Sequence, residues 1–140
     1  APQAVYDNPI NLFVAKFLGT PPINVFAGTV KNQRLYIGND VVLEAKGISD
    51  REVYVGIRPE GFVLAQDGDL HVNLSNVEVM GRDVSIVSTS EHSINPIIRS
   101  IIDADNKIDM SSKTVSFKLK PHKVFIFDKE TEERLYPEVK

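Results

Sequence analysis

The pattern of apolar and polar residues along the chain changes once, near residue 24. Before that point apolar side chains recur every three or four residues, the spacing of an α-helix, whereas after it apolar and polar residues largely alternate, as in β-strands. The sequence therefore predicts an all-β fold with one short N-terminal helix. We expect a linker and helix over residues 1–23 and a β domain over residues 24–140.

The predicted helix occupies residues 8–19. Asn8 can cap its first turn, Pro9 suits the first helical position, and Gly19 can adopt the left-handed conformation that ends a helix. Leu12 and Ala15 lie off its main apolar stripe, so the helix is apolar around most of its circumference and needs burial on more than one side. The stripe itself consists of Ile10, Phe13, Val14, Phe17 and Leu18.

Most of the remaining chain consists of short strand-like segments separated by turns. In the longest of them the apolar phase slips by one residue at Ser75 and Asn76, as a β-bulge would cause. An isoleucine-rich segment after Asn95 could be a capped helix, but its β-branched side chains favour a strand. This spacing of strands and turns predicts a small barrel or sandwich. Strands are expected at residues 25–31, 34–37, 41–43, 52–58, 62–65, 70–79, 83–89, 97–102, 114–120 and 124–127, followed by a polar tail.

Composition narrows the possible functions. The 140 residues include no cysteine, which excludes disulfides, thiolate metal sites and cysteine nucleophiles and suits a reducing, cytosolic compartment. The net charge of −3 argues against a chain whose main task is to bind phosphate backbones. No apolar run approaches the roughly 18 residues of a membrane span. A start at Ala1 without methionine suggests a fragment of a longer chain.

Candidate chemistry is sparse, so we assign no catalytic, cofactor-binding or metal-binding residue. His71, His92 and His122 lack partners at the spacing of metal ligands. Residues 103–106 begin like a calcium loop, but Lys107 stands where an oxygen ligand is needed, so a turn is expected. No nucleophile motif and no phosphate-binding Gly-x-x-x-x-Gly-Lys is present in the sequence.

Several motifs, in order, resemble one family. Residues 6–9 (YDNP), 13–21 (FVAKFLGTP), 55–60 (VGIRPE), 77–81 (VEVMG) and 125–131 (FIFDKET) are similar to the C-terminal part of ATPase subunits of ATP-binding cassette (ABC) importers for maltose, other oligosaccharides and glycerol phosphate. The resemblance implies a regulatory, transport-associated domain with an oligonucleotide-binding-like (OB-like) β fold. It is not an enzyme by itself, because the Walker A, Walker B and signature motifs are not in this sequence.

The resemblance also implies partners and a location. Two ATPase subunits pair through such domains, which act as a pivot for ATPase closure and as a docking site for regulatory proteins. The other expected partners are the nucleotide-binding domain, which would hold ATP and magnesium, and the membrane subunits, at the inner face of the cell membrane. We expect no cofactor in this chain and no nucleic acid. Structural or contact roles are implied for Arg58, Glu60, Glu78 and Gly81, the last in a turn.

The helix acquires an interdomain role under this interpretation, carried by Leu12, Phe13 and Phe17. We expect its second apolar side, with Leu12 and Ala15, to have lost its cover together with the ATPase domain. The helix should then pack against another copy or swing away from the barrel.

Two alternatives remain open. Related β modules bind oxyanions, and serines that could take part are Ser85, Ser88, Ser90 and Ser93. Residues 117–127 mix lysines and phenylalanines as barrels that bind single-stranded nucleic acid do, but the alternation places Phe117 and Lys118 on opposite faces, which favours core residues beside a solvated edge.

Overall fold

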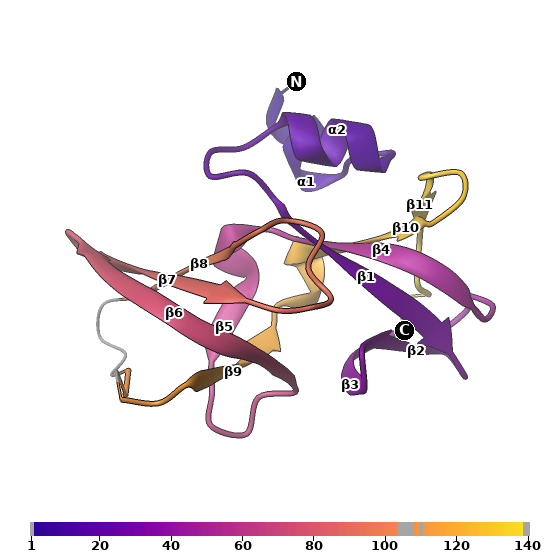
Figure 1. Cartoon of the computed structure of the whole chain (residues 1–140). Coiled ribbons are helices and arrows are strands. Elements are labelled where there is room, and N and C mark those ends of the chain that lie inside the picture. Colours follow the sequence, from indigo (N-terminus) through magenta and orange to yellow (C-terminus); the bar gives the residue numbers. More distant parts are fainter. Residues whose placement is uncertain (1, 104–107, 110, 139–140) are drawn as a thin grey trace.

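The fold consists of two antiparallel sheets and a pair of short helices (Figure 1). The computed structural model describes residues 2–103, 108–109 and 111–138. The predicted all-β, OB-like class with small barrel-like modules is confirmed. One sheet has the order β11-β10-β4-β1-β2-β3; the other, β5-β9-β6-β7-β8, nearly closes into a barrel because its edge strands β5 and β8 contact each other.

Most strands lie close to their predicted positions. The bulge is confirmed, since the register between β6 and β7 shifts between Leu74 and Asn76. The isoleucine-rich segment is strand β8, as expected, while the turn expected after Asp103 lies outside the described residues. The strands are β1 Asn24–Lys31, β2 Arg34–Ile37, β3 Asp40–Glu44, β4 Arg51–Ile57, β5 Phe62–Leu64, β6 Leu70–Met80, β7 Asp83–Thr89, β8 Ile98–Asp103, β9 Thr114–Leu119, β10 Val124–Asp128 and β11 Arg134–Leu135.

One hydrophobic core runs through both sheets. It includes Phe26 and Ile57 from the first sheet and Ile86 and Phe117 from the second, all essentially inaccessible to solvent. The buried amide of Asn24 joins the sheets: its nitrogen donates to the carbonyl oxygens of Ile57 and Arg99, both at 3.0 Å, and its oxygen accepts from the Arg99 amide at 2.9 Å. These bonds satisfy backbone groups where the two ladders separate.

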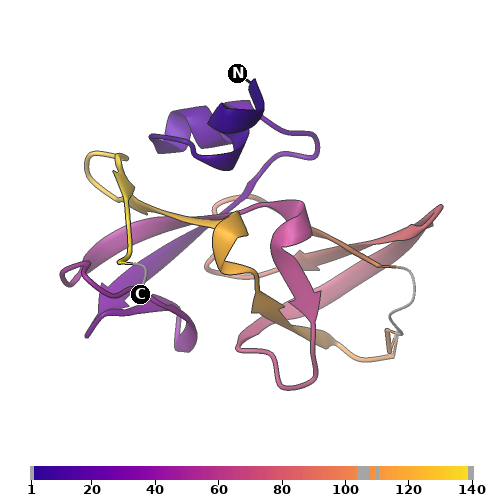
Figure 2. The same ribbon diagram turned by 180° about the vertical axis from the view of Figure 1, so that it is seen from behind.

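The chain crosses between the sheets twice, through two 3-10 turns that contact each other. The turn η1 (Pro59–Gly61) leads from β4 to β5, and η2 (Pro121–Lys123) leads from β9 to β10; Figure 2 shows the two crossings. The Arg58 amide donates to the Lys123 carbonyl at 3.1 Å, and the Lys120 amide donates to the Gly61 carbonyl at 2.8 Å. This junction fixes the positions of Arg58, Glu60 and Lys123.

The N-terminal region differs from the prediction in its helices. An unpredicted helix α1 spans Pro2–Asp7, and α2 is shorter than expected, at Leu12–Phe17. Asn8 is not the cap of α2; Asn11 is, because its side chain accepts a hydrogen bond from the Val14 amide at 2.8 Å. Gly19 has a φ of +105°, so the left-handed residue expected after the helix is confirmed.

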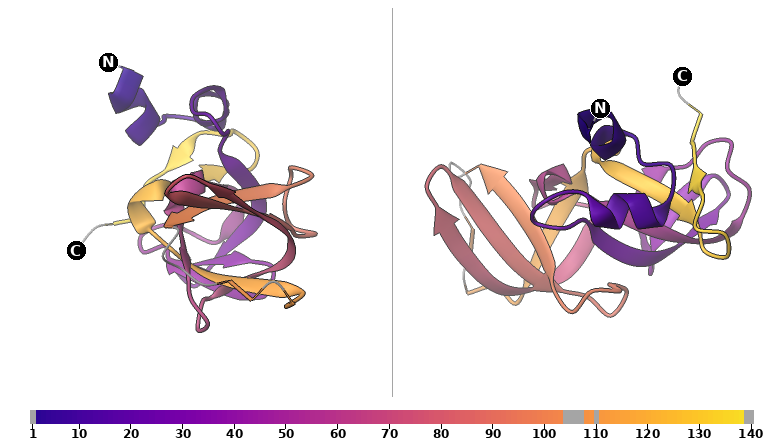
Figure 3. Two further views of the ribbon diagram at one scale, coloured as in Figure 1. Left: turned by 90° about the vertical axis from the view of Figure 1, so that its left-hand side faces the viewer. Right: turned by 90° about the horizontal axis from the view of Figure 1, so that it is seen from above.

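The orientation of α2 is opposite to the expectation. Leu12 and Ala15 are buried against Ile23, Val25, Phe125 and Phe127, whereas the stripe residues Phe13 and Phe17 are 70% and 76% exposed. The helix therefore does not swing away from the β domain and is not wholly buried against it (Figure 3). The small side chain of Ala15 lets the helix approach the sheet closely, which the larger stripe residues would prevent.

The polar tail also contains structure that the sequence did not indicate. Strand β11 pairs with β10, and around it the Arg134 amide donates to the Ile10 carbonyl at 3.1 Å while the Leu12 amide donates to the Glu132 carbonyl at 3.0 Å. The start of α2 is thus tied to the C-terminal tail.

Candidate functional site

Arg58 anchors both helices to the β domain. Its side chain is 1% exposed; Nη1 donates to the carbonyl oxygens of Ala15 (3.1 Å) and Leu18 (2.9 Å), and Nη2 donates to that of Tyr6 (2.9 Å). The guanidinium carbon also lies 3.9 Å from the centre of the Tyr6 ring, a cation–π contact. Arg58 therefore satisfies the terminal carbonyls of α2 from outside the helix.

Glu60 connects the same helices to the second crossing. One of its oxygens, Oε2, accepts from the Tyr6 hydroxyl at 2.7 Å and from the Lys123 ammonium at 3.1 Å. Arg58 and Glu60, both singled out from the sequence, are thus brought together around Tyr6. Their partners Tyr6 and Lys123 were not assigned roles from the sequence, because the residues of each pair lie far apart in the chain.

The protonation states in this cluster follow from burial and hydrogen bonding. Burial raises the pKa of Tyr6 to about 12, and the bond to Glu60 adds to the shift. Burial alone would raise the pKa of Glu60, but hydrogen bonds from Tyr6, the Glu60 amide and Lys123 outweigh it and hold that pKa below its ordinary value. Burial lowers the pKa of Arg58, which as an arginine still stays protonated. The proton between Tyr6 and Glu60 therefore remains on the tyrosine.

This arrangement predicts a pH dependence at the alkaline end. Because the pKa of Tyr6 is raised from about 10 in the unfolded chain to about 12 when folded, its contribution is fully present below about pH 10 and is lost as the pH rises toward about 12. We expect Tyr6→Phe to remove this loss from the pH profile of the free energy of unfolding, measured by urea denaturation, and Tyr36→Phe to keep it. An unchanged profile in Tyr6→Phe would contradict the assignment.

The two other motif residues lie elsewhere. Glu78 on β6 pairs with Arg99 on β8 at 3.0 Å, and Arg99 also donates to the Ser85 hydroxyl at 2.8 Å. Among the described residues no hydrogen bond or ion pair joins Glu78 to Arg58 or Glu60. Gly81 has a φ of +63° in the β6–β7 turn, so the expected turn is confirmed; an added Cβ would meet open space, and the backbone angle alone explains the glycine.

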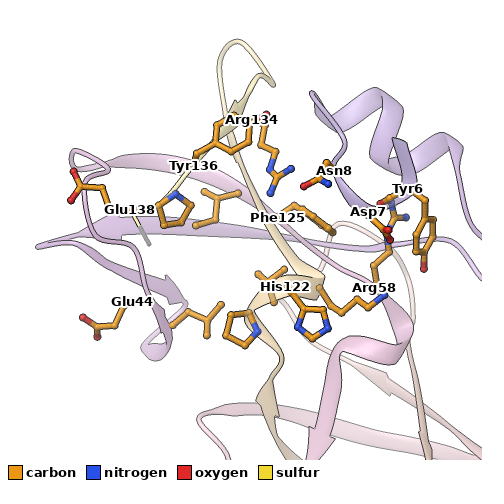
Figure 4. Close-up of a pocket in the computed structure, with 16 residues that line it drawn as sticks. Tyr6, Asp7, Asn8, Glu44, Arg58, His122, Phe125, Arg134, Tyr136 and Glu138 are labelled. Carbon is orange, nitrogen blue, oxygen red and sulfur yellow. The ribbon is translucent and has the colours of Figure 1, made fainter. Parts of the chain in front are cut away.

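A groove of about 970 Å³ runs beside the Arg58 cluster (Figure 4). Its walls come from the end of α1, from η2 and β10, from β3 and from the C-terminal tail. Arg134, also missed from the sequence, lies over the groove with its guanidinium carbon 4.8 Å from the Phe125 ring centre and 4.5 Å from that of Tyr136. The other lining residues are Tyr6, Asp7, Asn8, Leu43, Glu44, Arg58, Pro121, His122, Lys123, Val124, Ile126, Pro137 and Glu138.

The serines of the oxyanion alternative do not form a site. Ser85 binds Arg99, the Ser90 hydroxyl accepts from the His92 amide, and the Ser93 hydroxyl donates to the Asn95 carbonyl. Ser88 is fully buried and, as the alternation along β7 requires, lies on the opposite face of the strand from Ser85. The serines therefore provide no convergent donors for an anion.

The lysine and phenylalanine stretch has the ordinary structure expected of alternation. Phe117, Phe125 and Phe127 are buried in the core, and Lys118 lies 3.6 Å from an Asp69 carboxylate oxygen. These rings cannot stack on bases. Within the described residues no group of three or more potential metal ligands occurs, and none of the helices there has the length and apolar character needed to cross a membrane.

Known proteins similar to this chain are ATP-binding proteins of ABC transporters. The chain is 30% identical over 137 residues to the ABC transporter ATP-binding protein MG187 of Mycoplasma genitalium, covering 96% of this chain and 23% of that protein. It is 33% identical over 90 residues to the sn-glycerol-3-phosphate import ATP-binding protein UgpC of Escherichia coli O1:K1, covering 59% and 25%. It is 29% identical over 156 aligned positions to the ABC transporter ATP-binding protein YurJ of Bacillus subtilis, covering 96% and 41%.

The chain thus spans less than half of the length of each of these relatives. No family model matches it.

Proposed function

We propose that this chain, whose homologues are ATP-binding proteins of ABC transporters, is a non-catalytic regulatory and dimerisation domain of such a subunit in a sugar importer. In this proposal ATP and magnesium bind to another part of the polypeptide, because the sequence contains no phosphate-binding loop. The domain acts as a pivot when two subunits close on ATP and as a docking site for regulators. It works in the cytoplasm, at the membrane subunits of the transporter.

The observation that carries the proposal is an exposed apolar face on the helix pair. We define the α1–α2 apolar face as Val5, Ile10, Phe13 and Phe17, whose exposed fractions range from 42% to 76%. The rings of Phe13 and Phe17 stack with their centres 6.0 Å apart, and they share a shallow, almost wholly apolar depression with Pro2 and Val5. A contiguous apolar surface of this kind marks a contact with another protein surface.

The ATP-binding part of the same polypeptide is the occupant that fits this face best. The relatives are each more than twice as long as the stretch they share with this chain, so they contain further domains. The opposite side of α2 is already packed on the β domain through Leu12 and Ala15. A helix pair held between two domains has the geometry needed to pass movement of one domain to the other.

The proposal is tested by placing charge on the apolar face of the intact subunit. We expect Phe13→Asp combined with Phe17→Asp to reduce transport-coupled ATP hydrolysis strongly in the assembled transporter, because the carboxylates oppose burial at the domain contact. The same pair of substitutions should leave the folding of the isolated chain nearly unchanged, since both side chains are exposed there. Normal ATP hydrolysis and transport in the double variant would contradict the proposal.

A further inference from the structure

The groove beside Arg58 contains two buried guanidinium nitrogens that have no hydrogen-bond acceptor. These are the Nε atoms of Arg58 and Arg134, both of which line the groove. The two guanidinium groups lie near one ring, with their central carbons 5.7 Å and 4.8 Å from the centre of Phe125. In the part of the chain that the structure describes, these are the only buried arginine nitrogens without a partner.

The other nitrogens of these arginines show why the two Nε atoms are unusual. Arg58 uses Nη1 and Nη2 on three carbonyl oxygens, and Arg134 Nη1 donates to the Pro9 carbonyl at 3.4 Å. A buried donor on a cation costs free energy when it lacks an acceptor, so native proteins contain few such donors. Two of them beside one cavity indicate that an acceptor belongs there.

We propose that this groove binds a small organic carboxylate with an apolar body. A carboxylate is the acceptor that forms the strongest, charge-assisted hydrogen bonds with guanidinium groups. The volume of about 970 Å³ is that of a small-molecule site, and the buried wall residues Val124, Phe125 and Ile126 would contact the apolar part of the ligand. An inorganic anion would leave these walls uncovered.

The rim of the groove limits the charge of the ligand. Asp7, Glu44 and Glu138 line the groove and are exposed, and none of them has an ion pair within the described ranges. Figure 4 shows Glu44 and Glu138 at the end away from Arg58. These carboxylates repel further negative charge, so a ligand with one carboxylate at the arginine end is favoured over a polyanion.

Tyr136 is the side of the groove that can open. Its ring stacks on the Arg134 guanidinium yet is 61% exposed, and it belongs to the C-terminal tail. When this ring moves aside, Arg134 Nε becomes accessible and the ligand body takes its place on the guanidinium. Because Tyr6, Asp7 and Asn8 form the opposite wall, an occupied groove would stabilise the position of α1.

The proposal is tested with a matched pair of probes, 4-phenylbutyrate and 4-phenylbutylamine, which share the apolar body and differ in charge. In ¹⁵N-resolved NMR titrations we expect 4-phenylbutyrate to give saturable shifts of the Arg134 and Arg58 Nε–H signals. The amine and inorganic phosphate should give none. Arg134→Lys removes one Nε donor and is expected to weaken 4-phenylbutyrate roughly tenfold, whereas Arg82→Lys, at an exposed arginine in the β6–β7 turn, should leave its affinity unchanged.

The result that overturns the proposal is the lack of saturable binding by 4-phenylbutyrate, or equal binding of the amine. Unchanged affinity in a folded Arg134→Lys variant would also overturn it. If that variant does not fold, the two probes and the wild-type Nε–H signals decide the question without it.

Discussion

Replacing Arg58 with methionine is expected to lower the free energy of unfolding by about 3 kcal/mol. Methionine fills much of the same space but leaves the carbonyl oxygens of Ala15, Leu18 and Tyr6 without donors. We expect the loss to be concentrated in the helices, because these carbonyls belong to α1 and to the end of α2. Urea denaturation measures the total effect, and hydrogen exchange should show faster exchange in residues 2–18 than in β4.

The matched control is Arg82→Met, at an exposed arginine in the β6–β7 turn. Its effect is expected to stay within about 0.5 kcal/mol, as for most surface substitutions. Equal stability of the Arg58 and Arg82 variants, with normal protection of the helices, would show that Arg58 is not the anchor of the helix pair.

Truncation of Leu12 to alanine is the second substitution with a large expected effect, about 3 kcal/mol lost from the free energy of unfolding. Leu12 is 4% exposed and packs with Ala15, Val25 and Phe127 between α2 and the sheet. Removal of its side chain leaves a cavity that the six-residue helix cannot close without shifting. Thermal or urea unfolding of the isolated chain measures the effect.

Phe13→Ala is the control, on the adjacent but exposed side of the same helix. Although phenylalanine is larger than leucine, the 70% exposure of Phe13 predicts a change within about 0.5 kcal/mol in the isolated chain. A larger loss from Phe13→Ala than from Leu12→Ala would mean that α2 packs through its Phe13 and Phe17 stripe, in the orientation opposite to the one described.

The β domain could be predicted closely because alternation determines which side of a strand faces the core. The slip at Ser75 and Asn76 indicated the bulge in β6, since a one-residue shift moves every later side chain to the other face. The isoleucine-rich segment was recognised as a strand from its β-branched side chains.

The helix orientation could not be predicted, because a short helix with apolar residues on both sides has no clear direction of amphipathicity. Phe13 and Phe17 formed the larger stripe, yet Ala15 allows the closer approach to the sheet. Strand β11 was missed because Arg134–Leu135 is too short to show a period.

Arg58 and Glu60 were selected through family resemblance, whereas their contacts depend on Tyr6 and Lys123, which are distant in the chain. The contribution of these residues, and of Glu78 and Gly81, to regulation stays a prediction. Arg134 had no sequence signal, because its position beside Phe125 follows from the pairing of β10 with β11.

The central claim is that the α1–α2 apolar face is covered by the ATP-binding part of the polypeptide. Hydroxyl-radical footprinting measures this most directly, by comparing the oxidation rates of Phe13 and Phe17 in the isolated chain and in the intact subunit. Both rings are exposed here, so the account predicts several-fold slower oxidation in the intact subunit, with the rate at Met80 on the β6–β7 hairpin as the internal reference. Equal rates at Phe13 and Phe17 in the two proteins would contradict the account.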